Sequence, residues 1–358
     1  MPSTISGDIM NLRYLLLATA IAAACLPASV GHAYLAKQVR DWTVECSNGL
    51  TCKMSFSDWS AKGMQYVGFQ RKSAPDAPVE LRLRTAPDFS PDTDPTITFR
   101  FSVDGKELLA LAANDLTQAE HGDTYFYPDQ PKVLALMEAM EVGKSADVTV
   151  SGKAGSEVLA IKLNGVKAAM LYVDEVQGRL DRVDALEAKG DKQPQRSAVA
   201  KDIMTLEDMP EIVRKDFTDS GGACSDLEPE TIKQFEGFDV TVGRTELLGI
   251  PCATGGAYNQ PYALYVVGEV VERISFPIMQ DRSPTAMSTA MNINFDPITK
   301  TMTSFFRGRG IGDCGQFFKW QVNEKESNLT LLEMRSKGEC DEGGNDPTQF
   351  PLVWKAEQ

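Results

Sequence analysis

Residues 97–111 read ITFRFSVDGKELLAL, with apolar side chains at alternate positions up to Asp104-Gly105. A period of two puts the aromatic residues on one face of a β-strand and the polar residues on the other. Asp-Gly is typical of the tight turn of a β-hairpin, and Leu109 and Leu111 resume the apolar pattern beyond it. This stretch therefore predicts an antiparallel hairpin with one buried face.

The same alternation recurs on both sides of this hairpin. It covers residues 42–46, 79–84, 148–150, 159–163, 240–242, 262–266, 302–304, 317–322 and 329–332. One helix is expected to begin at Pro131, and a second is expected over residues 166–186, where a strand is the alternative. We therefore predict a mainly β fold with a minor α component: a sandwich-like N-terminal domain and a sandwich or propeller-like C-terminal domain.

Six of the seven cysteines fall into three local couples, namely Cys46/Cys52, Cys224/Cys252 and Cys314/Cys340. Six cysteines allow about 15 pairings. Pairing of sequential neighbours keeps each bond inside one predicted domain. Three disulfides indicate an oxidising compartment, either periplasmic or secreted.

Residues 1–33 have the features of a secretory signal peptide, since Arg13 precedes a short apolar run and small residues follow it. Met10 is the expected start, because residues 1–9 contain an acid and no base. Cys25 has the small Ala22 three positions before it, where lipidation sites usually carry a larger aliphatic residue, so we expect no lipid anchor.

Composition divides the rest of the chain into two domains. We expect an N-terminal domain at 34–188, a polar linker at 189–220 and a C-terminal domain at 221–358. No transmembrane segment is expected once the leader is removed.

The charge balance excludes several classes of function. Asp and Glu number 50 against 36 Lys and Arg, a net charge of −14, which argues against nucleic-acid binding. Beyond the leader His121 is the single histidine, so a zinc site with two histidines cannot form within one chain. Any catalysis by a Ser-His or Cys-His pair would have to use His121.

Residues 310–315, GIGDCG, fit the G-x-G-x-x-G pattern of dinucleotide sites. That site needs a helix after the glycines, whereas residues 316–322 alternate like a strand, so we expect a tight structural loop and no cofactor. Cys314 as a nucleophile would need a base, and no histidine follows it. We therefore expect no catalytic residue here.

Two further loops are candidates for binding. The acidic turn at 341–346 offers Asp341 and Asp346 as a calcium candidate, although its spacing misses the EF-hand pattern and a solvated turn is the default. The other candidate is a recognition patch formed by two loops, and its members are Tyr258, Asn259, Tyr262, Arg307, Arg309 and Asp313. The alternative, which we favour, makes the tyrosines core edges and pairs the arginines with local acids.

Three segments carry a family resemblance. They are LNGVKAA at 163–169 with DEVQGR at 174–179, GAYN at 256–259, and FD at 295–296 through RGIGDCG at 309–315 to the Cys340 region and Trp354. Together they resemble the secreted bacterial domain-of-unknown-function 1176 family over nearly the whole mature chain. This resemblance implies a periplasmic or secreted protein and supplies no established activity.

Two weaker resemblances concern the separate halves. Trp42 before the close pair Cys46/Cys52 is similar to invasion-associated locus B proteins, which are secreted β-domains. Strands such as 295–306 resemble β-rich periplasmic folds of the lysozyme-inhibitor type.

We therefore expect a non-enzymatic protein of the bacterial envelope that binds another protein or an envelope component. One alternative is inhibition of a lysozyme-like hydrolase, in which an acidic domain docks on a basic enzyme. The other is a hydrolase that uses clustered carboxylates.

Overall fold

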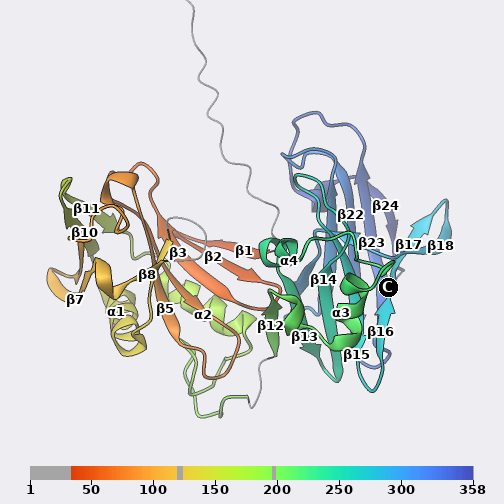
Figure 1. Ribbon diagram of the computed structural model, residues 1–358, viewed down its shortest axis with the longest axis horizontal. Coiled ribbons are helices and arrows are strands. Elements are labelled where there is room, and N and C mark those ends of the chain that lie inside the picture. The colour runs from red at the N-terminus through yellow and green to blue at the C-terminus, as the bar shows by residue number, and fades with distance from the viewer. Residues whose placement is uncertain (1–33, 119–123, 196–198, 358) are drawn as a thin grey trace, which may run out of the picture.

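The protein is mainly β, as the sequence predicts (Figure 1). The structure is a computed structural model that describes residues 34–118, 124–195 and 199–357, with the backbone alone for residues 34 and 35. The expected signal peptide at 1–33, including Cys25, lies outside the described residues, and so does His121. None of the helices in the described part of the chain has the length and apolar character of a membrane span.

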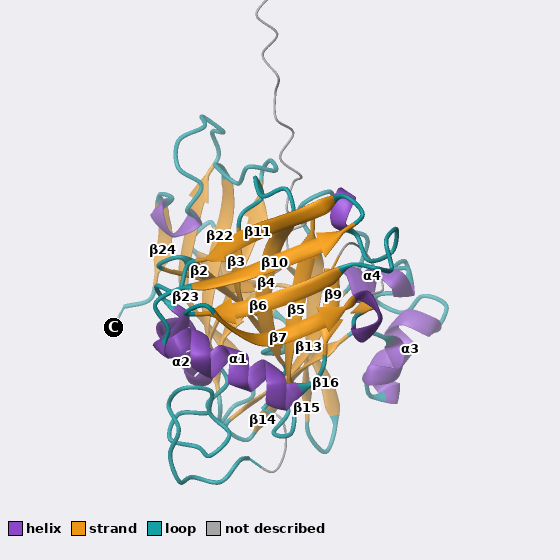
Figure 2. Cartoon of the chain, turned by 90° about the vertical axis from the view of Figure 1, so that its left-hand side faces the viewer, coloured by secondary structure: helices purple, strands orange, loops and turns teal. Residues whose placement is uncertain are grey.

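Two antiparallel sheets form the N-terminal half. The larger has the order β1-β2-β3-β4-β5-β9-β8 and the smaller the order β11-β10-β6-β7. Their strands are β1 Tyr34–Val39, β2 Trp42–Ser47, β3 Cys52–Ser57, β4 Met64–Arg71, β5 Val79–Thr85, β6 Thr98–Val103, β7 Lys106–Ala112, β8 Thr117–Gln118, β9 Thr124–Tyr127, β10 Ala146–Gly152 and β11 Gly155–Ile161. Figure 2 shows the smaller sheet in front of the larger one, and buried side chains from both sheets form one core.

The hairpin predicted from residues 97–111 is confirmed as β6 and β7. Phe99 and Phe101 are buried, while Arg100 between them is exposed. Asp104 (φ 49°) and Gly105 (φ 77°) both have positive φ, the conformation that the two-residue turn of a twisted hairpin requires.

Two helices close one edge of this sandwich (Figure 2). Helix α1 spans Gln130–Val142 and contacts β5 and β7, one strand from each sheet. Helix α2 spans Val166–Val176 and packs on β2 and β3. The expectation that α2 continues to residue 186 is wrong. Gly178 adopts a left-handed φ of 64° just beyond the helix, and the chain then turns into a loop.

The C-terminal half contains two larger sheets and a small hairpin. The first sheet has the order β12-β13-β14-β15-β16 with β19 beside β15, the second runs from β20 to β24 in sequence order, and β17 pairs with β18. The bounds are β12 Ala200–Ile203, β13 Gly237–Val242, β14 Thr245–Pro251, β15 Pro261–Val267, β16 Val271–Ile274, β17 Phe276–Gln280, β18 Ser283–Met287, β19 Ala290–Met291, β20 Asn294–Asp296, β21 Thr301–Arg307, β22 Gly315–Asn323, β23 Asn328–Lys337 and β24 Leu352–Lys355. Two short helices, α3 Glu211–Thr218 and α4 Pro229–Phe235, precede β13.

The central strands of the sheet β12–β16, β14 and β15, are buried on both faces. Val240, Leu247 and Leu264 share a core with Trp320 and Phe318 of the second sheet, an arrangement of the sandwich type. Leu248 and Ile250 face a separate core against α3, close to the disulfide Cys224–Cys252. Burial on both faces explains why β14 and β15 have almost continuous apolar runs.

The two halves share buried contacts. The side chain of Asn48 accepts a hydrogen bond from Phe295 N (2.8 Å) and donates one to Ile293 O (3.0 Å). The stretch 189–220, expected as a linker, contains η3 Leu206–Asp208, α3 and the strand β12, which pairs with β13. The division into separate domains stays a prediction, because the core residues of both halves form one connected cluster.

Candidate functional site

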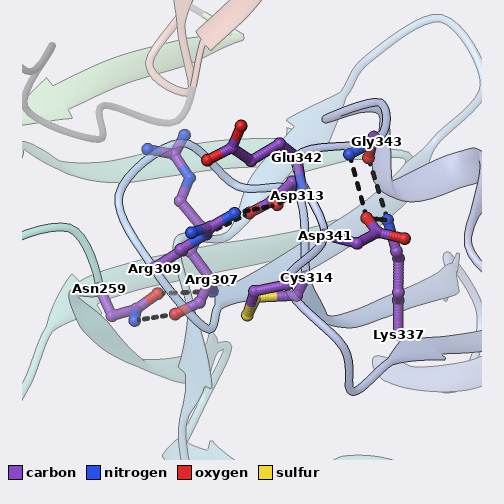
Figure 3. The surroundings of a disulfide bond; sticks show 10 residues. Asn259, Arg307, Arg309, Asp313, Cys314, Lys337, Asp341, Glu342 and Gly343 are labelled. Carbon is purple, nitrogen blue, oxygen red and sulfur yellow. Dashed lines mark hydrogen bonds and ion pairs between the residues drawn. A yellow bond between two sulfur atoms is a disulfide. The ribbon is translucent and has the colours of Figure 1, made fainter.

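The two loops proposed as a recognition patch lie side by side, with Asn259 of one next to Arg307 of the other (Figure 3). Asn259 donates from Nδ2 to Arg307 O (2.8 Å), and its Oδ1 accepts from Arg307 N (2.9 Å). Asn292 donates to Tyr258 O (3.0 Å) and to Phe305 O (2.9 Å), which fastens both loops to the sheet. The side-chain amides of Asn259 and Asn292 therefore join two segments that lie about fifty positions apart in the chain, by hydrogen bonds to their backbone.

An ion pair between the partly exposed Arg309 and the buried Asp313 fixes the second loop. Arg309 donates from Nε (2.8 Å) and Nη2 (2.6 Å) to the two carboxylate oxygens of Asp313, which is 2% exposed. Glu342 N donates to the same carboxylate (2.7 Å). The hydrogen bonds from Arg309, and then the one from Glu342 N, hold the pKa of Asp313 far below its ordinary value. This carboxylate joins the loop at 309–313 to the acidic turn at 341–346.

The disulfide Cys314–Cys340 makes the same connection covalently, and the predicted pairs Cys46–Cys52 and Cys224–Cys252 are also formed. A strand, β22, follows the glycine run, as the alternation at 316–322 predicts, whereas a dinucleotide site of the G-x-G-x-x-G type needs a helix there. Gly315 has a φ of 142°, and a Cβ there would lie 1.9 Å from Phe306 O, so only glycine fits.

The six predicted patch residues divide into three groups. Tyr262 is 1% exposed and donates from its hydroxyl to Phe235 O (2.6 Å), so it belongs to the core and leaves the candidate surface. Asn259 and Asp313 shape the loops from within, through the hydrogen bonds described above. Tyr258, Arg307 and Arg309 remain partly exposed.

Sequence reasoning missed one residue of this surface. Ile311, at the tip of the loop, is 57% exposed. A single apolar residue among glycines has no apolar neighbours at a regular spacing, so no periodic pattern marks it. The signal that could have found Ile311 was its position inside a polar turn. Tyr258, Arg307, Arg309 and Ile311 are called the loop surface below. Figure 3 shows the side chains of Arg307 and Arg309 on the same side of the loop as Glu342.

The two carboxylates of the calcium candidate serve their own turns. Asp341 accepts from Lys337 Nζ (2.5 Å) and from Gly343 N (3.0 Å). Asp346 accepts from the backbone N (2.9 Å) and the hydroxyl (2.7 Å) of Thr348. These bonds lower the pKa of both carboxyl groups. Within the described residues, neither belongs to a group of three candidate ligand atoms close enough to share a metal ion.

The DEVQGR segment at 174–179 forms a cluster of buried polar side chains in the N-terminal half of the molecule. Asp174 is fully buried and accepts from the backbone N of residues 186, 187 and 188 at 2.8–3.0 Å. Arg179 is also buried, pairs with Asp184, and donates to the carbonyls of Ser73 and Ala74. These contacts tie the loop after α2 to the loop after β4. The GDCG run at 312–315 and the QGR run at 177–179 therefore both take part in holding loops in place.

Comparison with known proteins bears on the whole chain. The family model described as "Protein of unknown function (DUF1176)" matches residues 36–357. The "Uncharacterized protein YpfG" of Escherichia coli (strain K12) is 24% identical over 350 residues, covering 92% of this chain and 96% of that protein. The crystal structure of invasion-associated protein B from Bartonella henselae aligns at 16% identity with a TM-score of 0.30, over 40% of this chain and 99% of that chain.

That TM-score is too low to support an inference. The family match, by contrast, extends from the first described strand to the last and includes all three segments that carried the resemblance. As those segments predicted, the chain belongs to the DUF1176 family.

Proposed function

We propose that this chain is a non-enzymatic binding protein of the bacterial envelope, periplasmic or secreted, that holds a protein partner through the loop surface. The observation that carries the proposal is that some residues of the loops hold the backbone in place while others are exposed. Asn259, Asp313 and the disulfide Cys314–Cys340 fix the backbone from inside, while Arg307 and Ile311 stay accessible.

A preorganised loop favours binding because little conformational entropy is lost when a partner docks. Ile311 supplies an apolar anchor, and arginine and tyrosine are the side chains that most often dominate binding energy. Burial lowers the pKa of Arg307, whose guanidinium lies 5.8 Å from the centre of the Phe305 ring. Three disulfides in the folded chain support an oxidising compartment.

The proposal is tested by quantitative capture from envelope extract. Ile311→Asp combined with Arg307→Ser places a charge at the anchor and removes a cation. Val158→Asp is the matched control, since Val158 is 63% exposed on β11 in the other half of the molecule. The wild type and Val158→Asp should retain the same partner, and the double variant should lose it. Equal retention by all three proteins would refute the loop surface as the binding site.

A lysozyme-like hydrolase is a sharper candidate for the partner. The chain carries a net charge of −14, and the exposed Asp341 and Glu342 border the loop surface, which suits a basic enzyme. Inhibition of lysozyme by the wild type, and its loss in Glu342→Lys, would support this partner. Full lysozyme activity at an excess of the wild type would remove it.

The carboxylate-dependent hydrolase stays the rival from another class. It requires two carboxyl groups about 5–9.5 Å apart across a cleft. Burial, and then the neighbouring Asp239, raise the pKa of Glu246 on the sheet β12–β16. Lys201 pairs with Asp239 at 3.0 Å, which suits a surface ion cluster. Turnover of a glycan substrate that is lost in Glu246→Gln would favour this rival over the binding proposal.

A further inference from the structure

A cleft of about 510 Å³ lies where the two halves of the molecule meet. One wall comes from β3, β4, β5 and the loop after β4, and the other comes from β12 and α4, which lie at the junction in Figure 1. The charged residues of its lining come from five separate segments of the chain. They are Lys53, Lys72, Arg82, Lys201, Asp202, Lys233 and Glu236.

The sign of charge in this cleft is opposite to that of the whole protein. Five cationic side chains line the cleft with two acidic ones, and Asp239, which pairs with Lys201, brings the acids to three. Two positive charges remain in surplus, in a chain with a net charge of −14. Low-dielectric walls concentrate such a field and attract small ions of the opposite sign. The residues Lys53, Lys72, Arg82, Lys201 and Lys233 are called the basic cleft below.

Asp202, one of the two acidic residues of the lining, is hydrogen-bonded to side chains of the opposite wall. Asp202 accepts from the hydroxyl of Ser47 (2.6 Å) and from that of Thr51 (2.5 Å), one on each carboxylate oxygen. Lys201 makes an ion pair with Asp239 (3.0 Å), yet its side chain stays 57% exposed. Arg82 bonds to Gln70 and lies 4.4 Å from the centre of the Phe126 ring, which fixes the position of its charge.

Two further observations concern the polar groups of the lining. Burial, and next the charge of Arg82, lower the pKa of Lys53, so the cations crowd one another. The hydroxyl of Ser73, also in the lining, is buried and has no hydrogen-bond partner among the described residues. A buried polar group without a partner is rare.

We propose that the basic cleft binds a small organic anion with two or three negative charges on phosphate or carboxylate groups. The positive surplus favours an anion with more than one negative charge, and the volume suits a molecule larger than a single inorganic ion. Four of the five cations are lysines, which bind such groups as point charges and do not require a planar partner. This site is distinct from the loop surface and goes beyond the proposed function.

Calorimetric titration with pyrophosphate and with citrate, at constant ionic strength, tests the proposal on the whole mature chain. Lys72→Gln and Lys72→Gln/Lys201→Gln remove charges from exposed positions and should leave the fold intact. Lys106→Gln/Lys325→Gln is the control, since both of these lysines are exposed and lie outside the lining. Circular dichroism checks that each variant is folded.

We expect saturable one-to-one binding of at least one of the two anions. Pyrophosphate alone would assign phosphate ligands, and citrate alone would assign polycarboxylates. Affinity should fall about fivefold for each lysine removed from the cleft and stay unchanged in the control. The absence of saturable binding with both anions, or equal weakening by the control pair, would overturn the proposal.

Discussion

The disulfide Cys314–Cys340 is expected to fix the loop surface locally as well as to stabilise the fold. Replacing both cysteines by alanine opens a loop of 26 positions, whose closure entropy corresponds to about 3.5 kcal/mol of stability. The pair Cys224–Cys252 closes a loop of 28 positions and is worth almost the same, about 3.6 kcal/mol. The two double variants should therefore lose similar free energy of unfolding in urea, while the loop surface changes in only one of them.

Amide hydrogen exchange separates the global effect from the local one. Gly308 N donates to Cys314 O (2.9 Å), Gly312 N donates to Arg309 O (3.0 Å) and Glu342 N donates to Asp313. In Cys314→Ala/Cys340→Ala these three amides should exchange at least about tenfold faster than in Cys224→Ala/Cys252→Ala, because only the first variant frees the loop ends. Equal protection in both variants would refute the reasoning that this disulfide preorganises the loop surface.

Three further predictions concern stability. Asp174→Ala leaves three backbone N–H groups without their acceptor, so the free energy of unfolding in urea should fall by about 3 kcal/mol. A loss below about 1 kcal/mol would contradict the role given to this carboxylate. Hydrogen bonds from Lys153 N and Thr96 lower the pKa of Asp94 to about 2, below its value in the unfolded chain. The stability that ionised Asp94 contributes is therefore present above about pH 4 and is lost as the pH falls through about 2. Asp94→Asn should make stability fall less steeply at acid pH, and an unchanged slope would count against this. Gly315→Ala should lower stability in thermal melts by about 1–3 kcal/mol, because Gly315 has a positive φ and the added Cβ would meet Phe306 O. Gly256→Ala is the control and should have little effect, since no atom lies within 4 Å of its added Cβ. Similar effects of the two variants would show that the close approach of Gly315 to Phe306 O is unimportant.

Local patterns in the sequence predicted the fold class and the disulfides. The alternation at 97–111 specifies a hairpin because it matches the pleat of a strand, and the turn residues Asp104-Gly105 suit the positive φ found there. The length of α2 was overestimated because its end depends on Gly178 and on Asp174, whose carboxylate holds amides that lie 12–14 positions further along the chain. Apolar periodicity carries no information about such a bond.

The candidate site was predicted in part. The sequence offered the patch of two loops only as a candidate, and the structure places the two loops side by side. Arg309 pairs with Asp313, as the favoured alternative supposed. Tyr262 was a candidate for the patch because its loop is rich in tyrosine. It lies buried in β15, in agreement with the favoured alternative, which made the tyrosines core edges. The basic cleft could not be anticipated, since its cations come from distant segments that only the packed halves bring together.

The central claim, that the loop surface binds a protein partner, is tested most directly by photo-crosslinking in cells. A photoreactive amino acid is placed at position 311, and in a second protein at position 158, where the side chain is about equally exposed. The account predicts a discrete adduct of higher mass from position 311 and none from position 158. No adduct from position 311, or the same adducts from both positions, would contradict it.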